Sequence, residues 1–507
     1  MRSRDLVIVV IVAAAAVTVG ALLYLGREGE PAFAIEVNAV DPADLGVDEW
    51  LEDFRSLYEF VEGNYPYLEL KERTHGYNWL DLREGLEERI RAAQDSAGFL
   101  QVIMDAVGAL QNRHSHVLRP GVVSEYQAQF SDLTPMNLVF CEEVVEAADY
   151  WAPIYDAMSD TSYNRRFEAR VVYDRGDYII TDYYGNPLTE VGVKVTAVNG
   201  VPIDDAVMTC LESSYIDWDF QRSRHYLWWI SPQDFGADAV FTVLDTGGGE
   251  REVSFQTYGG PSSFWALYPS PIVAFERYEE DKVAYMYVKT FDPSRVEPYY
   301  DDVMEFYGEI VDYDFLVIDI RGNTGGAFST WVDGIVRPLI EEDALHEYYL
   351  AYRTGAYVRW FHEGFLEDKV EVPKDAFDNL PPEALGEGCE IYNFSTTYAA
   401  THAVNFSGQV ILLTDSVVYS AAEGFTNFCK QTGFAKIYGT PSGGDGFFVW
   451  PVYYALPNSK IVVTMSSSMS LDRTGRANEE ARTQPDVYVE TRFMAHGELV
   501  DFVLRDI

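Results

Sequence analysis

The spacing of apolar residues changes twice along the chain, and each change predicts a different kind of structure. From Asp48 to about Ala109 apolar residues recur every three or four positions, which predicts amphipathic helices and an N-terminal helical domain over residues 45–118. Short alternating runs between residues 165 and 260 predict a β module. Over residues 270–507 strand-like and helix-like stretches alternate, which is typical of an α/β core. The pattern therefore favours a multidomain α/β protein.

The alternating region contains one specific turn signal. Val193 to Val198 reads as a strand, and Asn199 and Gly200 follow it, a pair that is typical of tight hairpin turns. This stretch resembles the segment of PDZ domains in which a strand meets such a turn. The resemblance implies a PDZ-like module over residues 165–260 that binds extended peptides by strand addition. A general β module accounts for the same residues.

Two runs in the last region are apolar almost throughout. Phe315 to Ile320 is apolar except for Asp319, and Val410 to Leu413 is entirely apolar. Strands of parallel sheets carry such runs because helices cover both of their faces. We therefore expect these two runs to be strands of the α/β core.

The first residues contain a long uncharged stretch, Leu6 to Gly26. A bilayer span needs about 20 apolar residues, whereas the apolar part of a cleaved signal needs about 7–15. Arg2 and Arg4 precede the stretch, so the positive-inside rule places the bulk of the chain outside the cytoplasm. We expect residues 1–26 to be a single-pass membrane anchor, with a cleaved signal and a secreted protein as the alternative. Residues 27–44 read as an acidic linker.

Charge and cysteine content narrow the class of partner. The 507 residues include 37 Lys and Arg against 81 Asp and Glu, a formal net charge of −44. Such a surface repels phosphate backbones, which argues against nucleic-acid binding. Four widely spaced cysteines without a C-x-x-C pair argue against a zinc knuckle and leave any disulfide pairing open: Cys141, Cys210, Cys389 and Cys429. The sequence indicates neither a metal nor an organic cofactor.

Ser420 lies where the apolar run of residues 410–413 has ended and a helix is expected to begin. The free N–H groups and positive end of a helix N-terminus can stabilise an oxyanion, so Ser420 is a candidate nucleophile. On this feature alone, a helix N-cap is the favoured interpretation of the serine. Gly325 and Gly326 follow the other apolar run and let backbone N–H groups approach a ligand closely. An ordinary strand-to-helix turn is the alternative for these glycines.

His114 and His116 flank a serine just after the predicted helices. Acyl transfer needs a base that titrates near neutral pH, and histidine supplies one. Taken alone, such a histidine pair is more often structural than catalytic. Glu479, next to a predicted turn and strand, can orient a histidine or can be an exposed surface charge.

In this order the segments resemble the C-terminal processing (tail-specific) peptidase family and its tricorn-like branch. The matching segments are Leu110 to Ser115, Asp319 to Gly326, Ser420 to Glu423, Gly439 to Gly444, and Glu479 with Pro485 to Val489. The resemblance covers about residues 45–490. It implies a ClpP/crotonase-like α/β core and a serine endopeptidase that hydrolyses polypeptides outside the cytoplasm. The oligomeric state stays open.

Two positions depart from the family pattern. The processing peptidases use a Ser–Lys dyad, and the lysine position falls here on Asp445, which cannot act as an amine base. Asn112 stands where the family usually has aspartate. Tricorn-like relatives use histidine as the base with Ser and Glu beside it, so the resemblance implies His114 as base and Glu479 as the residue that orients it. His116 is the alternative base.

The resemblance also implies an oxyanion site built from the N–H groups of Gly325, Gly326 and Ala421. A different class of function remains open, since the same fold occurs in modules that bind apolar ligands or peptides without cleaving them. The presence of Ser420, His114 and Glu479 together favours an active peptidase over such a pseudo-peptidase scaffold.

Overall fold

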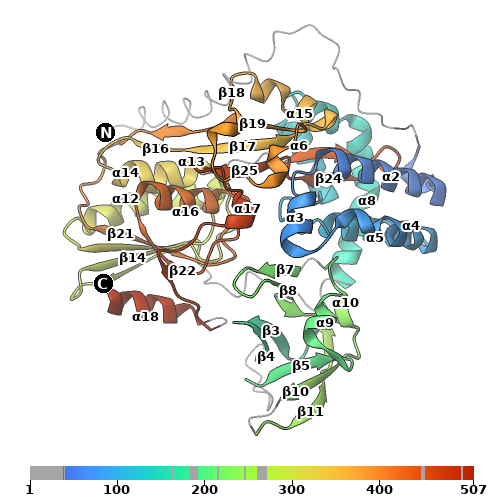
Figure 1. Ribbon diagram of the computed structural model, residues 1–507, viewed down its shortest axis with the longest axis horizontal. Helices are drawn as coiled ribbons and strands as arrows, with labels where there is room; N and C mark the ends of the chain where they lie inside the picture. The colour runs from blue at the N-terminus through green and yellow to red at the C-terminus, as the bar shows by residue number, and fades with distance from the viewer. Residues whose placement is uncertain are drawn as a thin grey trace.

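The computed structural model of the chain describes residues 38, 40–161, 165–181, 192–213, 216–244, 247–259, 271–446, 451–492 and 495–507. The expected anchor at residues 1–26 and most of the predicted linker lie outside these ranges. Within them, no helix combines the length and the apolar character that crossing a membrane requires. The described chain forms an N-terminal group of helices, a β module and an α/β core (Figure 1).

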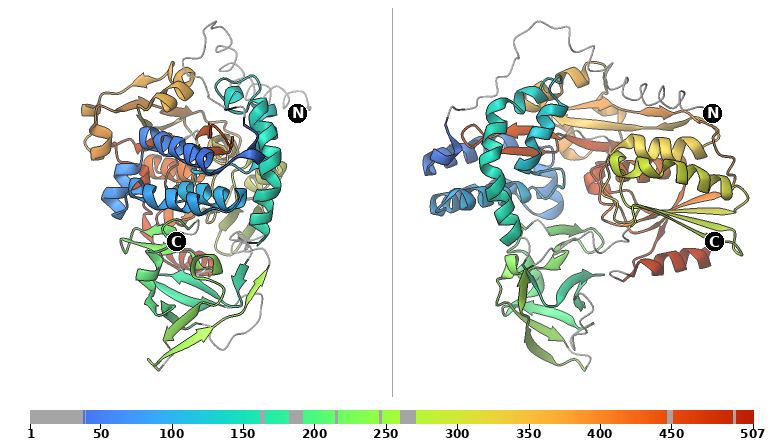
Figure 2. Two further views of the ribbon diagram at one scale, coloured as in Figure 1. Left: turned by 90° about the vertical axis from the view of Figure 1, so that its right-hand side faces the viewer. Right: turned by 180° about the vertical axis from the view of Figure 1, so that it is seen from behind.

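The N-terminal helices extend further along the chain than the predicted boundary at residue 118. They are α2 (Val47–Asn64), α3 (Leu68–His75), α4 (Arg83–Ala92), α5 (Ser96–Gly108), α6 (Val123–Gln129), α7 (Met136–Val139) and α8 (Glu142–Thr161). Asp95 begins α5 by accepting a hydrogen bond from the Gly98 N–H at 2.9 Å, as expected of an N-cap. The long helix α8 stands beside α5 (Figure 2).

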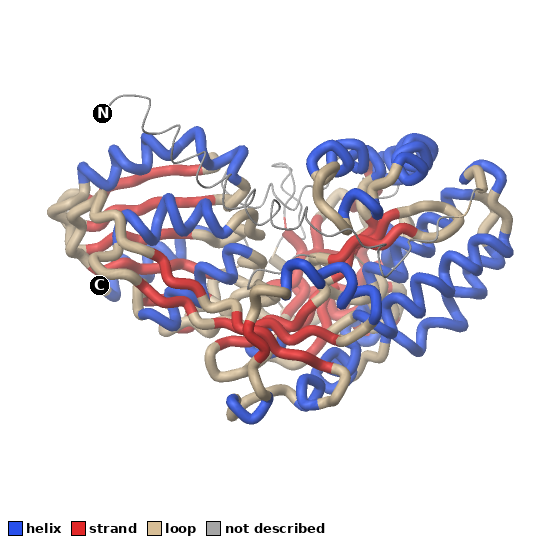
Figure 3. The backbone as a smooth tube through the Cα atoms, turned by 90° about the horizontal axis from the view of Figure 1, so that it is seen from above, coloured by secondary structure: helices blue, strands red, loops and turns tan. Residues whose placement is uncertain are grey.

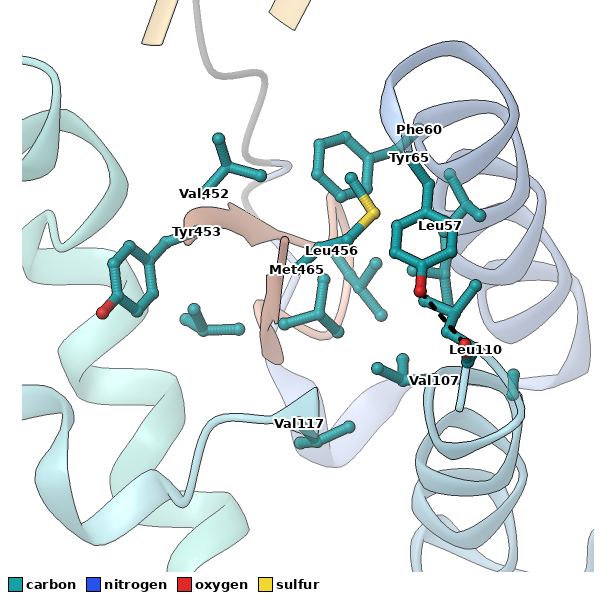
Figure 4. Close-up of a cluster of buried hydrophobic side chains, with 14 of the residues drawn as sticks. Leu57, Phe60, Tyr65, Val107, Leu110, Val117, Val452, Tyr453, Leu456 and Met465 are labelled. Atoms are coloured by element: carbon teal, nitrogen blue, oxygen red, sulfur yellow. Dashed lines mark hydrogen bonds between the residues drawn. The ribbon is translucent and has the colours of Figure 1, made fainter. Parts of the chain in front are cut away.

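The helices share their hydrophobic core with strands from the far end of the chain. Figure 4 shows Leu57, Phe60 and Tyr65 of the α2 region facing Leu456 and Met465. These partners belong to or follow β23 (Val452–Ala455) and β24 (Val462–Met465). The short strand β1 (His116–Val117) pairs with β24, His116 opposite Thr464. Because of this pairing, the segment that carries His114 is fixed to the C-terminal third of the chain.

The β module is a seven-stranded antiparallel sheet in the order β11-β10-β5-β4-β3-β9, with β6 paired to β5. Its strands are β3 (Arg170–Asp174), β4 (Asp177–Thr181), β5 (Lys194–Val198), β6 (Val201–Pro202), β9 (Trp229–Ile230), β10 (Val240–Leu244) and β11 (Glu250–Ser254). The predicted turn after Val198 is confirmed, since Asn199 and Gly200 both have positive φ, 51° and 76°. Nearby lie α9 (Ile203–Val207), α10 (Pro232–Phe235), and β2 (Arg165–Phe167) paired with β12 (Thr257–Gly259).

A separate hairpin projects from this module toward the rest of the molecule (Figure 1). It consists of β7 (Ile216–Asp219) and β8 (Arg224–Leu227). The rings of Trp218 and His225 pack against His75 of α3, with centroids 4.3 and 5.7 Å away. The hairpin therefore docks on the N-terminal helices.

The α/β core is built on a sheet in the order β13-β14-β15-β21-β22-β26, parallel from β14 onward. Its strands are β13 (Val273–Tyr278), β14 (Val283–Val288), β15 (Phe315–Asp319), β21 (Gln409–Thr414), β22 (Lys436–Gly439) and β26 (Val487–Tyr488). One face is covered by α11 (Pro293–Val296), α12 (Tyr300–Glu309), α13 (Phe328–Trp331), α14 (Arg337–Leu339) and α16 (Ala421–Thr432), the other by α18 (His496–Asp506). The two apolar runs predicted as strands are β15 and β21, which confirms that prediction.

A second sheet, β18-β19-β17-β25, lies beside the core. Its strands are β17 (Tyr348–Arg353), β18 (Val370–Glu371), β19 (Cys389–Asn393) and β25 (Ser468–Asp472), with α15 (Ala356–Leu366), α17 (Asn478–Ala481) and the pair β16 (Ala344–His346) and β20 (Thr396–Tyr398) nearby. Seen from above, the core sheet and the N-terminal helices lie at opposite ends of the molecule (Figure 3). All four cysteines are unpaired.

Neighbouring parallel strands bring the chemical motifs together. Strands β15 and β21 pair in parallel, so their carboxyl ends lie at the same edge of the sheet. The glycine loop after β15 and the turn after β21 that leads to Ser420 therefore meet.

Candidate active site

Ser420 occupies the turn between β21 and α16. Its backbone has φ 57° and ψ −128°, a conformation that a residue with a side chain adopts only under constraint. It stands at the N-cap position, yet its side chain makes no capping hydrogen bond to the helix. The hydroxyl points instead to His114, so the structure favours the nucleophile interpretation over the N-cap.

His114 is the histidine that the structure brings next to Ser420. Its Nε2 lies 3.1 Å from Ser420 Oγ, within hydrogen-bond reach. Two hydrogen bonds fix the segment of residues 110–114. The Thr464 hydroxyl donates to the His114 carbonyl at 3.0 Å, and the Tyr65 hydroxyl donates to the Leu110 carbonyl at 3.0 Å. His116 lies in β1 with an exposed side chain and does not contact Ser420.

The other ring nitrogen of His114 faces Asp445. The distance from His114 Nδ1 to Asp445 Oδ2 is 3.1 Å, and the aspartate is fully buried. Burial by itself would raise the pKa of this carboxyl, but the hydrogen bond and charge of His114, with hydrogen bonds from Asn112 and Ser466, hold the pKa well below its usual range. Asp445 is therefore a carboxylate.

Glu479 does not hold the position that the sequence predicted for it. Its Oε1 accepts a hydrogen bond from Lys71 Nζ at 2.6 Å, and Arg482 Nη2 lies 4.0 Å from the same oxygen. Among the described residues no hydrogen bond joins Glu479 to His114, and Asp445 occupies the place beside the ring. The assignment of Glu479 as the orienting residue is thus corrected. Lys71 lies in α3, more than 400 positions earlier, so no local pattern could show this pairing.

The two glycines lie against the nucleophile turn and leave no room for side chains. A Cβ on Gly325, which has φ 102°, would lie 2.8 Å from both Ser420 Cβ and the Ala421 nitrogen. A Cβ on Gly326, which has φ 142°, would lie 2.1 Å from the Phe291 carbonyl carbon. Glycine is therefore required at both positions, for space as well as conformation.

The free N–H groups at this turn differ in part from the predicted three. The Gly325 N–H donates to Asn323 Oδ1 at 2.9 Å, and because an amide has one proton, this donor is already engaged. The N–H groups of Gly326 and Ala421 donate to no acceptor within the described chain. These two are the candidate oxyanion donors, and Gly325 contributes by its lack of a side chain.

Two further residues of the family motif are structural. Glu423 is buried in α16 and accepts from Asn478 Nδ2 at 2.5 Å and Thr483 Oγ1 at 2.6 Å, which joins α16 to the chain around α17. Burial raises its pKa, although these hydrogen bonds act in the opposite direction. Asp319 forms a buried ion pair with Arg321 at 2.6 Å. Within the described residues no group of three or more His, Cys, Asp or Glu is suited to hold a metal ion.

Arg113 connects the β7–β8 hairpin to the turn that precedes Ser420. The guanidinium donates to Asp217 Oδ2 of β7 at 2.8 Å and to the Val417 carbonyl, in the turn before Ser420, at 3.2 Å. It also lies 5.1 Å above the Tyr419 ring, a cation–π distance. Arg113 thus links the hairpin, the histidine segment and the nucleophile turn.

A cavity of about 220 Å³ lies between this hairpin and the core loops next to the site. Its walls include Phe220 and Trp228 from the β module, and Val417, Gly443 and Arg482 from the core. The Arg482 guanidinium packs over the Phe220 ring at 4.6 Å. The cavity adjoins the turns that carry Ser420 and Asp445.

Comparison with known proteins gives one family match and several similar folds. Residues 282–489 match the family model described as peptidase family S41. No curated protein matches the sequence. Among solved structures, mature CPAF complexed with lactacystin is similar with a TM-score of 0.55 at 14% identity, over 90% of this chain and 98% of that one. The photosystem II D1 C-terminal processing protease has a TM-score of 0.39 at 15% identity, over 87% of this chain and 93% of that one.

The structural likeness establishes the fold, and the family match covers the β15 loop, the Ser420 turn and the Glu479 segment. Residues 282–489 are thus similar to peptidase family S41, and this similarity supports a serine-type peptidase.

Proposed function

We propose that the protein is an endopeptidase that cleaves polypeptides through an acyl-enzyme on Ser420, with His114 as general base. The observation that carries this proposal is the 3.1 Å separation of His114 Nε2 and Ser420 Oγ. Nucleophile and base must lie within hydrogen-bond reach, and here they do.

In the first half of the reaction, His114 Nε2 takes the proton of the Ser420 hydroxyl while Oγ bonds to the carbonyl carbon of the substrate. The carbonyl oxygen becomes an oxyanion, which the N–H groups of Gly326 and Ala421 would bind. Loss of one such donor typically costs about 2.7–4 kcal/mol of transition-state stabilisation. The C–N bond then breaks, and His114 returns the proton to the leaving amine.

In the second half, water attacks the acyl-enzyme. His114 accepts a proton from the water as its oxygen bonds to the acyl carbon. The bond from that carbon to Ser420 Oγ breaks, and the proton passes to the serine. The products are two peptides and the original enzyme.

We also propose that the enzyme works outside the cytoplasm. The support is the uncharged stretch Leu6 to Gly26 with Arg2 and Arg4 before it. A membrane anchor and a cleaved signal both predict this location. Protease accessibility of the protein in intact cells, with fractionation of membranes and medium, separates the two, and a protein found only in the cytoplasm contradicts both.

The test of the catalytic proposal is digestion of a mixed peptide library by the full chain, read by mass spectrometry. Ser420→Ala should abolish every cleavage that the parent makes. Ser416→Ala is the matched control, because it removes a hydroxyl from the same turn without touching His114. Cleavage that survives Ser420→Ala would refute the assignment of the nucleophile.

A further inference from the structure

Asp445 occupies a loop that leaves it little freedom. It lies between Gly444 and Gly446, and a Cβ on Gly446 would lie 2.1 Å from Glu423 Cβ. The Asp445 backbone has φ 44°, a left-handed conformation that aspartate and asparagine tolerate better than most residues. The loop therefore presents the carboxylate in one place.

The carboxylate is surrounded by donors from several parts of the chain. Tyr67 donates to Oδ1 at 2.5 Å, and Oδ2 receives Asn112 Nδ2 at 2.7 Å, Ser466 Oγ at 2.7 Å and Tyr419 OH at 3.2 Å. Each of these protein groups can donate, so the ionised form of Asp445 satisfies all of them at once. A carboxylate that is buried and held in this way is pre-organised before substrate arrives.

The remaining neighbour of Oδ2 is His114 Nδ1, at 3.1 Å. An ionised carboxylate can only accept a hydrogen bond, so Nδ1 must carry the ring proton. The neutral ring then has Nε2 without a proton, which is the form that can take the proton of Ser420. The same negative charge stabilises the imidazolium that forms when the proton arrives.

We propose that Asp445 is the positioning residue of this active site: it fixes the tautomer and direction of the His114 ring and stabilises its charged form. This inference rests on the proposed function and names the group that makes His114 a base. The two positions that depart from the family pattern touch each other, since Asn112 donates directly to Asp445. We infer that the two departures depend on each other, because an aspartate at position 112 would place a second carboxylate against that of Asp445.

Other charged groups near His114 are engaged elsewhere. Lys71 pairs with Glu479 at 2.6 Å and Arg113 pairs with Asp217 at 2.8 Å. The Tyr419 ring lies 4.9 Å from the His114 ring, and its hydroxyl donates to Asp445. Asp445 is thus the carboxylate in hydrogen-bond contact with the ring.

The test uses the full chain with ¹⁵N-labelled histidine, because nitrogen chemical shifts show which ring nitrogen carries the proton. The parent should show His114 protonated at Nδ1. Asp445→Asn should move the proton toward Nε2, since the amide can donate to Nδ1, and should lower kcat about 10³- to 10⁴-fold with KM nearly unchanged. Glu479→Gln should leave the tautomer as in the parent.

A second variant separates loss of activity from loss of folding. The exchange Asn112→Asp with Asp445→Asn keeps the charge, the shapes and the mutual hydrogen bond, but takes the carboxylate away from Nδ1. Its thermal midpoint shows whether it is folded at the assay temperature, and the folded variant should still lose at least about 100-fold in kcat.

The proposal is overturned if the parent tautomer is Nε2–H, if Glu479→Gln changes the tautomer and Asp445→Asn does not, or if the exchange variant is as active as the parent. The spectroscopic result is independent of peptide cleavage. A parent with Nδ1–H that cleaves no peptide supports the positioning of His114 by Asp445 and refutes the proposed function instead.

Discussion

The buried pair of Lys71 and Glu479 offers the sharpest test of what holds the site in place. The side chains are 6% and 2% exposed, and Lys71 also donates to the Gln111 carbonyl at 2.9 Å, just before the histidine segment. Removing one partner of a buried ion pair leaves the other charge without compensation and costs about 3–5 kcal/mol. We expect Lys71→Met to destabilise the protein by this amount.

The double variant Lys71→Met with Glu479→Gln removes both charges and should recover part of the loss. We expect a coupling free energy of at least about 2 kcal/mol from the double-mutant cycle, since the two groups are in direct contact. The assay is thermal and urea unfolding of the parent, the two single variants and the double variant. Arg353→Met is a matched control, because it removes a cation from the exposed pair with Glu69 and should change stability by less than about 1 kcal/mol.

Peptidase activity of the same four proteins tests the role of Glu479. A structural Glu479 predicts that the double variant keeps kcat within about tenfold of the parent, because Asp445 still contacts His114. Two results would refute the reasoning. One is a double-mutant cycle that gives no coupling free energy between Lys71 and Glu479. The other is a double variant that folds well and loses kcat as completely as a variant of the nucleophile.

Further predictions concern the glycine loop, the histidine pair and the pH dependence. Gly325→Ala should reduce kcat by at least about 100-fold, because the added methyl would lie 2.8 Å from Ser420 Cβ. Gly121→Ala is the control, because open space surrounds Gly121. Equal kinetics for the two variants would contradict the packing of Gly325 against Ser420. His114→Ala should abolish cleavage while His116→Ala preserves it, and the reverse result in a cleavage assay would exchange their roles. The pKa of Asp445 is lowered on folding, so its stabilising contribution is present above the unfolded value of about 3.9 and is lost as the pH falls through the folded value. Thermal midpoints between pH 3 and 6 should therefore fall less steeply toward acid in Asp445→Asn, and parallel curves would refute this linkage.

Much of the architecture could be predicted because it depends on residues that are near one another in the chain. The apolar runs at residues 315–320 and 410–413 specify strands through side-chain burial, and Asn199 with Gly200 specifies a turn through backbone conformation. The boundary of the helical part was not predictable in the same way. Its apolar faces are completed by β23 and β24 from the C-terminal part of the chain, so the helices extend to Thr161 as one unit with those strands.

The sequence by itself determined the chemical groups available, a serine at a strand-to-helix turn, a histidine after the helices and glycines after a strand, because each depends on local conformation. It did not determine which carboxylate faces the histidine. Asp445 and Glu479 are both acidic residues in the C-terminal part of the chain. Because α3 packs against α17, Lys71 forms its ion pair with Glu479. Asp445 is then the carboxylate that contacts His114. Charge pairing in a buried site is decided by distances across the folded chain, and these follow from tertiary contacts that no stretch of sequence contains.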